Sequence, residues 1–289
     1  MDLFPFLVTQ CANAFSQAAL LFFLGVGLTL IFGIMRIVNF AHGSFYMLGA
    51  FIGYTVAHVT GSFWLGLLLS PVLAGLIGTS FEMGLLRRLY RRDTSAFLMV
   101  TFGLTLVMGE AIRLLWGVQG LQLPLPSMLA GIVFLFDEPF PVYRLFLIAA
   151  GAVLAVAIWQ FLERTRLGLL IRATSQNAEM VHALGVDVNL VRSGIFGMGC
   201  GLAAFGGVLA APLVTASLGM AANAIVDSFV IVIIGGMGSF PGSLCAAVLV
   251  AFVQVFGTYY FPDFAIAAMY LLMLLVLAIR PGGLLGQEA

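Results

Sequence analysis

The most informative pattern in the chain is a series of long runs without an ionised side chain. A helix needs about 20 apolar residues to cross the hydrocarbon core of a bilayer. The segments Leu20–Leu24 and Leu271–Leu277 are continuously apolar, unlike the alternating strands of a membrane β-barrel. The pattern therefore predicts an all-α polytopic membrane protein. The longest runs without Asp, Glu, Lys or Arg cover residues 3–35, 37–81, 193–226 and 228–262.

We expect about nine crossings in a single transmembrane domain that takes in residues 1–289. The seventh and eighth crossings are short and rich in small residues, which is typical of broken or re-entrant helices, so totals of eight and ten also fit. Gly197 with Gly201, and Gly238 with Gly242, have the spacing that lets two helices approach closely in lipid. The expected crossings are 12–34, 40–59, 62–86, 95–116, 143–163, 193–214, 223–238, 242–259 and 263–280.

Composition narrows the class of protein further. Hydrophobic residues make up 62% of the chain and charged residues 8%, so a water-soluble fold would lack polar surface. The net charge of +0 gives no indication of a nucleic-acid partner. Lys is absent, which excludes a Walker A phosphate loop. Cys11, Cys200 and Cys245 are odd in number and lack metal-ligand spacing, so we expect neither a disulfide framework nor a metal site.

The basic residues predict the orientation, because Lys and Arg are enriched on the cytoplasmic side. Two crossings separate the two Arg groups, so both fall inside, together with Arg36 and Arg280. The start of the chain is then external and its end internal. Arg113 and Arg144 are exceptions at the outer side, and residues 117–142 form the largest external segment. The two groups are Arg87, Arg88, Arg91 and Arg92, and Arg164, Arg166, Arg172 and Arg192.

A polar segment between the first two crossings carries the first candidate site. Asn39, His42 and Gly43 lie between two very apolar stretches. Polar groups at membrane depth line a cavity or are buried in protein, so we interpret these three residues as candidates for a translocation path. The alternative is a short inner turn whose Arg36 extends to the membrane surface.

A glycine-rich segment between the seventh and eighth crossings carries the second candidate site. One interpretation is a discontinuous helix whose free amides and carbonyls face a substrate, and the alternative is a tight turn. The segment loosely resembles residues 33–43, which suggests an internal repeat. The candidate path residues here are Gly235, Gly236, Gly238, Ser239 and Pro241.

The longest polar stretch, about residues 164–192, carries the third candidate site. Residues 179–185 predict a short helix that ends at Gly185. Asn177 or Ser175 has the side chain to cap its start. A helix presented on the cytoplasmic face of so apolar a protein suggests a docking surface, and the alternative is a solvated loop.

Three motifs in the chain carry a resemblance to a known family: Asn39-Phe-Ala-His-Gly43 followed by Tyr46-Met-Leu-Gly49, then Gly235–Gly242, and then Arg280-Pro-Gly-Gly-Leu-Leu-Gly286. With these motifs the chain is similar to permease subunits of ATP-binding-cassette importers for branched-chain amino acids, namely the first of the two permeases of such a system. Urea and short-chain amide permeases share most of these features.

The resemblance implies partners and a docking role. In such importers a cytoplasmic helix of the permease fits a cleft on the ATPase, and its motif places Gly six positions after Glu, as Glu179 and Gly185 are spaced. Met180 and Val181 replace two small residues of that motif. The implied partners are two ATPase subunits that use ATP, a second similar permease or a second copy of this chain, a periplasmic binding protein and the bacterial inner membrane. The implied coupling residues are Gly168, Arg172, Asn177, Glu179 and Gly185.

Other functions remain open at this stage. Glu110 and Arg113 are three residues apart on one expected helix, and Asp227 lies near the outer end of the seventh crossing. These charges are either candidate contacts for a zwitterion or structural and interfacial groups. A stand-alone channel or secondary transporter fits the polar segments, but intramembrane carboxylates for ion coupling are scarce. The chain has no His-Glu-x-x-His stretch or Gly-x-Ser-x-Gly elbow, so we expect no enzyme and no bound cofactor. The resemblance favours leucine, isoleucine and valine as substrates, with other neutral amino acids as the alternative.

Overall fold

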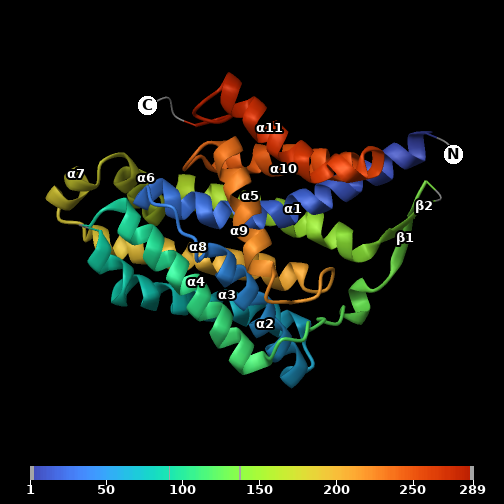
Figure 1. Ribbon diagram of the computed structural model, residues 1–289, viewed down its shortest axis with the longest axis horizontal. Coiled ribbons are helices and arrows are strands. Elements are labelled where there is room, and N and C mark those ends of the chain that lie inside the picture. Colours follow the sequence, from blue (N-terminus) through green and yellow to red (C-terminus); the bar gives the residue numbers. More distant parts are fainter. Residues whose placement is uncertain (1–2, 91, 137, 287–289) are drawn as a thin grey trace.

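The computed structural model describes residues 3–90, 92–136 and 138–286 as a long bundle of helices (Figure 1). Its elements agree with the expected crossings to within a few residues, apart from an earlier start of the first helix. The α-helices are α1 (Leu3–Met35), α2 (His42–Thr60), α3 (Phe63–Gly84), α4 (Thr94–Trp116), α5 (Val142–Arg164), α6 (Arg166–Gln176), α7 (Ala178–Ala183), α8 (Val188–Ala210), α9 (Met220–Gly235), α10 (Phe240–Tyr260) and α11 (Ala265–Ile279). Three short 3-10 helices are η1 (Leu86–Leu89), η2 (Ser127–Leu129) and η3 (Pro262–Phe264).

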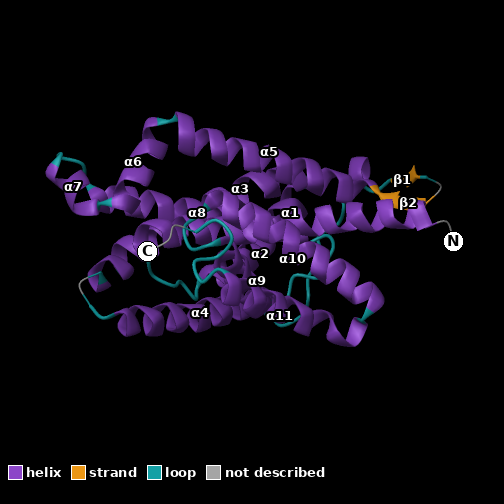
Figure 2. Cartoon of the chain, turned by 90° about the horizontal axis from the view of Figure 1, so that it is seen from above, coloured by secondary structure: helices purple, strands orange, loops and turns teal. Residues whose placement is uncertain are grey.

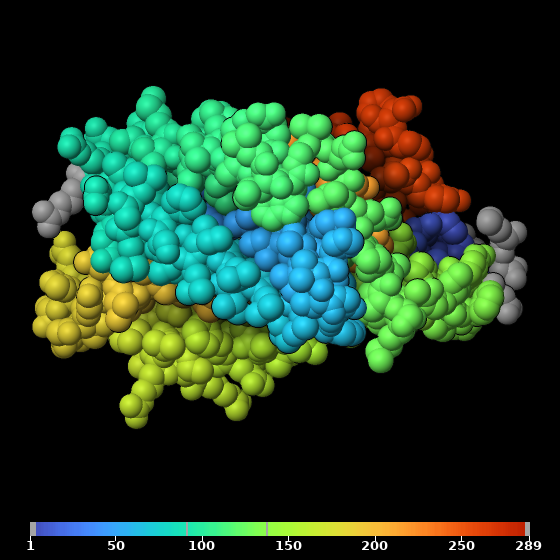
Figure 3. Space-filling model, turned by 90° about the horizontal axis from the view of Figure 1, so that it is seen from below, coloured from blue at the N-terminus to red at the C-terminus, as the bar shows by residue number. Residues whose placement is uncertain are grey.

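Helices α1 and α8 form the centre of the bundle. In each of them 78% of the most apolar window is buried, against 22% in α5 and 17% in the last helix. Helix α8 packs on α1, α2 and α3, and α1 packs also on α5, α9 and α10 (Figure 2). The space-filling view in Figure 3 shows α3 and α4 at the surface, where large apolar side chains such as Leu68 and Phe102 are exposed. A surface of this kind is stable only against lipid or another membrane protein.

The expected count of nine crossings is not confirmed. In the described part of the chain, seven helices are long and apolar enough to cross a membrane, and α2 and α9 are not among them. Helix α9 has 16 residues, which correspond to about 24 Å, less than the roughly 30 Å of a hydrocarbon core. Helix α2 carries His42, Ser44 and His58, which lower its mean hydropathy.

The expectation of an all-α chain misses one small sheet. Strands β1 (Ile132–Leu135) and β2 (Glu138–Pro141) form an antiparallel hairpin in the segment expected to be external, and Asp137 lies outside the described residues. The β-branched and aromatic residues of Ile-Val-Phe-Leu favour a strand. The run is too short for the hydrophobic pattern to separate it from a loop.

The two ends of the bundle differ as the Arg pattern predicts. The start of α1 and the hairpin lie at one end, and α6 and α7 at the other (Figure 1). Arg36 reaches the Ser175 carbonyl of α6, and Arg87 reaches Ser193 of α8. Arg87 belongs to the first predicted inner group, of which Arg91 lies outside the described residues. Arg172 of the second group pairs with Glu163 beside α6. Both groups therefore contribute to the α6–α7 end.

Glycines let the central helices approach closely. A Cβ on Gly207 would lie 2.0 Å from the Tyr46 carbonyl oxygen of α2. A Cβ on Gly201 would lie 2.8 Å from the Pro71 carbonyl oxygen of α3, and one on Gly197 would lie 3.0 Å from that of Gly75. The spacing of Gly197 and Gly201 therefore has the helix-packing role that small residues have in lipid.

Gly207→Ala tests this packing. The added methyl group must push α8 away from backbone atoms of α2, so we expect the variant to lose about 1–3 kcal/mol of stability. Gly194→Ala is the matched control on the same helix, because nothing lies within 4 Å of its Cβ position. Thermal unfolding in detergent is the measurement, and equal melting temperatures for the two variants would contradict the packing described here.

Candidate functional site

The segment between α1 and α2 folds back into the bundle. Helix α2 begins at His42, whose Nε2 donates to the Leu24 carbonyl at 3.0 Å. Leu24 lies eleven residues before the end of α1 at Met35, which corresponds to about 16 Å of helix. Residues 36–41 therefore run back along α1, and α2 begins deep between the helices.

Polar atoms without partners gather at the start of α2. Asn39, His42 and Ser44 are fully buried, and Asn39 Oδ1 accepts from the Ala41 amide at 3.0 Å. In the described part of the chain Asn39 Nδ2, His42 Nδ1 and Ser44 Oγ have no hydrogen-bond partner. Leaving such a group unpaired costs about 1–3 kcal/mol, so these atoms are candidates for hydrogen bonds to water or to a polar solute. Ser44 was not among the residues predicted from the sequence to line a path.

Gly43 brings α9 against this start. A Cβ on Gly43 would lie 2.2 Å from the Ala221 carbonyl oxygen and 3.0 Å from the Ile225 amide. Helix α9 runs across α1 rather than along it (Figure 1). The first half of α9 and the start of α2 therefore form one junction at the middle of the bundle.

Arg36 does more than extend to the membrane surface. Its φ is 51°, in the left-handed region that non-glycine residues seldom occupy. Its Nη2 lies 3.4 Å from the Ser175 carbonyl oxygen, at the last turn of α6. The backbone conformation at the end of α1 thus directs a side chain onto the helix that leads into α7.

The glycine-rich segment is a tight turn between α9 and α10. Gly236 and Gly238 have φ values of 98° and 82°, which glycine adopts without steric cost. Ser239 Oγ accepts from the Gly242 amide and caps α10, with Pro241 in its first turn. Of the two interpretations offered by the sequence, the structure has the turn. A role of Gly235, Gly236, Gly238, Ser239 and Pro241 in a path stays a prediction.

The C-terminal segment completes this turn, which the sequence analysis did not anticipate. The Leu284 amide donates to the Ile234 carbonyl at 2.8 Å, and the Leu285 amide donates to the Gly235 carbonyl at 3.1 Å. Residues 280–286 therefore cap the C-terminal end of α9. The contact needs glycine on both segments, because a Cβ on Gly283 would lie 2.5 Å from Gly236 Cα. The glycines of both segments were therefore a signal of this contact in the sequence.

The α6–α7 segment (Arg166–Ala183) is folded by local capping. Thr165 Oγ1 accepts from the Gly168 amide, and a Cβ on Gly168 would lie 2.3 Å from the Phe161 carbonyl oxygen. The sharp bend after α5 therefore requires glycine at this position. Arg172 pairs with Glu163 across the bend.

Helix α7 has the two caps predicted for it. Asn177 Oδ1 accepts from the Met180 amide at 2.9 Å, so Asn177 rather than Ser175 is the N-cap. Gly185 has a φ of 85°, and the Gly185 and Val186 amides bond back to the His182 and Val181 carbonyls. These two bonds are the Schellman pattern of a helix end.

The exposed side of α7 is partly apolar. Met180 and Leu184 are 59% and 77% exposed, and Glu179 is also exposed. Val181, the second of the two large residues in the motif, is 6% exposed and faces the bundle. Only Met180 of that pair is therefore available to a partner.

The charged residues of the apolar helices differ in their surroundings. Arg113 Nε donates to Glu110 Oε2 at 2.8 Å, and both side chains are exposed. This pair borders a groove of about 350 Å³ between α4 and the junction of α2 with α9. Asp227 was expected near the outer end of its crossing, which is wrong: it lies at the middle of α9 and is half-buried. Within the described residues no hydrogen bond or ion pair joins it.

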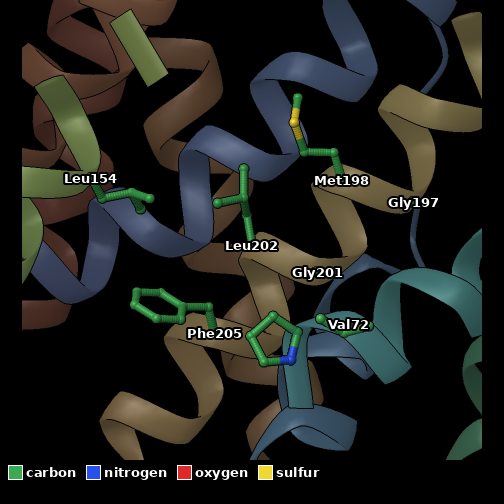
Figure 4. Close-up of a pocket in the computed structure, with 8 residues that line it drawn as sticks. Val72, Leu154, Gly197, Met198, Gly201, Leu202 and Phe205 are labelled. Atoms are coloured by element: carbon green, nitrogen blue, oxygen red, sulfur yellow. The ribbon is translucent and has the colours of Figure 1, made fainter. Parts of the chain in front are cut away.

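A second groove, of about 280 Å³, lies between α3, α5 and α8 (Figure 4). Apolar side chains such as Leu154, Met198 and Phe205 border it, beside Gly197 and Gly201. None of the predicted path residues lines it, and its walls offer no polar side chain to orient a zwitterion. In the described ranges His, Cys, Asp and Glu side chains nowhere form the group of three that a metal ion would need.

Comparisons with known proteins agree with these features. BraD of Pseudomonas aeruginosa, a high-affinity branched-chain amino acid transport system permease protein, is 27% identical over 96% of this chain and 95% of its own length. LivH of Escherichia coli, of the same description, is 24% identical over 98% of this chain and 97% of its own length. LivM of Escherichia coli is 26% identical over 97% of this chain but 71% of its own length.

A sequence model of a whole family also matches most of the chain. The sequence model described as "Branched-chain amino acid transport system / permease component" matches residues 10–279. That range includes α1 to α11 apart from the first residues of α1. It therefore includes the buried start of α2 and the α6–α7 segment. The chain belongs to the family of branched-chain amino acid transport permeases.

Proposed function

We propose that the chain is a membrane-spanning subunit of an ATP-driven importer for leucine, isoleucine and valine. The observation that carries the proposal is the family match over residues 10–279. Relatives named as branched-chain amino acid permeases match at nearly full length. The near-complete coverage of LivH and BraD, against 71% of LivM, favours the first of the two permeases in such a system.

The proposal includes partners. Two ATPase subunits hydrolyse ATP, because this chain has no phosphate-binding loop of the Walker type. A second, LivM-like permease forms the other half of the pore, and a periplasmic binding protein delivers the amino acid. The assembly resides in a bacterial inner membrane, and this chain itself binds no cofactor.

The geometry supports a mechanism for energy coupling. An ATPase that engages the exposed side of α7 moves the α6–α7 segment. Arg36 connects the last turn of α6 to the segment that leads into α2. The buried start of α2, with the unpaired atoms of Asn39, His42 and Ser44, then opens to one side of the membrane. Its polar groups replace water around the charged ends of the amino acid during passage.

Substitution of the exposed apolar residues of α7 tests the docking role. Met180→Asp combined with Leu184→Asp places two carboxylates where apolar contact is expected, so the ATPases should no longer co-purify from mild detergent and uptake should fall to background. Met128→Asp is the matched control, because Met128 is 77% exposed in the segment expected to be external.

Three other results would contradict the proposal. Full ATPase recovery by the double variant would show that α7 is not the docking helix. A wild-type chain that purifies alone from membranes containing the ATPases would favour a stand-alone channel or secondary transporter. Uptake of urea or an amide, without leucine, by the complete assembly would assign the related substrate class.

Thiol accessibility tests whether the start of α2 lines the path. In a chain whose Cys11, Cys200 and Cys245 are replaced by Ala, Ser44→Cys should resist a charged methanethiosulfonate at rest and react during ATP-driven transport. Ser70→Cys is the control, because Ser70 is equally buried but donates to the Gly49 carbonyl at 2.8 Å between α3 and α2. Protection of Ser44→Cys throughout active transport would remove this segment from the path.

A further inference from the structure

A buried carboxylate lies at the α6–α7 end of the bundle. Glu82 is in the last turn of α3 and is the only Asp or Glu that is fully buried among the described residues. The Tyr90 hydroxyl donates to Glu82 Oε1 at 2.5 Å, and the Ser193 hydroxyl donates to Glu82 Oε2. Arg87 Nη2 lies 3.7 Å from the same oxygen. Both carboxylate oxygens are therefore paired.

The partners of Glu82 also contact one another. Arg87 Nη2 donates to Ser193 Oγ at 2.6 Å. The Arg192 guanidinium carbon lies 5.1 Å from the centre of the Tyr90 ring, within the range of a cation–π contact. These contacts join the end of α3, the η1 turn and the second turn of α8. We call Glu82, Arg87, Tyr90, Arg192 and Ser193 the Glu82 cluster.

The Glu82 cluster resists separation of the helices that it joins. A buried carboxylate is costly unless donors satisfy both oxygens, and removal of one partner leaves an uncompensated charge. Burial, with the hydrogen bond to Glu82, raises the pKa of the Tyr90 hydroxyl above its ordinary value, so Tyr90 remains a donor. The C-terminal end of α3 and the first turns of α8 cannot separate without breaking several charge-assisted hydrogen bonds together.

Two residues of the cluster, Arg192 and Ser193, follow α7 closely in the chain. Helix α7 ends at Ala183, Asp187 caps α8, and Ser193 follows in the second turn of α8. The N-terminal side of the α6–α7 segment has its own connection, through Arg36. On the C-terminal side, among the described residues, Ser193 of the Glu82 cluster makes the first buried side-chain hydrogen bonds between the chain that leaves α7 and the other helices.

We propose that the Glu82 cluster transmits the movement of α7 to α3 and α8, which makes Glu82 a positioning residue for transport. This proposal rests on the docking of an ATPase at α7. When α7 moves, the first turns of α8 and the end of α3 move together. Helix α8 then displaces α2, against which it packs, and changes the access to the start of α2.

The test uses the complete assembly in proteoliposomes. Glu82→Gln keeps the size and one acceptor oxygen but removes the charge that aligns the donors. We expect both ATPases to remain bound and basal ATP hydrolysis to continue, while the amino acid transported per ATP hydrolysed falls about tenfold, the factor that corresponds to the energy of one charge-assisted hydrogen bond. Tyr90→Phe should lower the same ratio less, because Ser193 and Arg87 still hold the carboxylate.

Ser70→Ala is the matched control. It removes a buried hydroxyl from the same helix, and the hydroxyl's bond to Gly49 lies outside the cluster. It should lower the melting temperature without changing transport per ATP. A Glu82→Gln ratio equal to that of the wild type, with comparable unfolding temperatures, would overturn the proposal and leave Glu82 a purely stabilising residue.

The outcomes separate this proposal from the docking itself. If Glu82→Gln does not fold, Tyr90→Phe and Ser193→Ala carry the test, and unchanged ratios in both would overturn it. If the wild-type assembly lacks ATPases, the proposed function fails. If the ATPases bind at α7 but hydrolysis and transport stay coupled in all cluster variants, the Glu82 proposal alone fails.

Discussion

Close backbone contact along α8 is the constraint on which the rest of the structure depends. In lipid there is little hydrophobic gain from joining two apolar helices, so association relies on dispersion contacts at short range and on hydrogen bonds. A Cβ on Gly199 would lie 2.7 Å from the Gly27 carbonyl oxygen of α1, and one on Gly207 would lie 2.0 Å from that of Tyr46 on α2. Glycines on successive turns of α8 therefore let α1, α2 and α3 pack closely around that helix.

This packing also explains how buried polar groups come to lie at the start of α2. With α1 and α8 in contact at Gly27, the ring of His42 fits beside them and reaches the Leu24 carbonyl, so α2 can begin inside the bundle. Each unpaired polar atom there adds a cost that the surrounding contacts must offset. A second set of polar contacts lies at the α6–α7 end, where Arg36 and the Glu82 cluster link that segment to the bundle.

Local signals were read correctly where neighbours in the chain decide the structure. The apolar runs predicted the helices, and the caps of α7 followed from Asn177 and Gly185, because an N-cap and a left-handed helix end involve residues only a few positions apart. Glu110 and Arg113 pair for the same reason, since they lie three residues apart on one helix. The hairpin at Ile132–Leu135 was missed because four residues carry too little periodicity.

The sequence alone determined that the chain is a helical membrane protein, which end carries the Arg groups, and the family to which it belongs, since composition and short motifs are local properties. Tertiary structure decided which groups meet. Residues 280–286 cap α9, Glu82 meets Ser193 across 111 positions, and Asp227 lies at the middle of a short helix. Such pairings depend on how helices cross and on backbone approach at glycine, and neither can be derived from the order of residues along one helix.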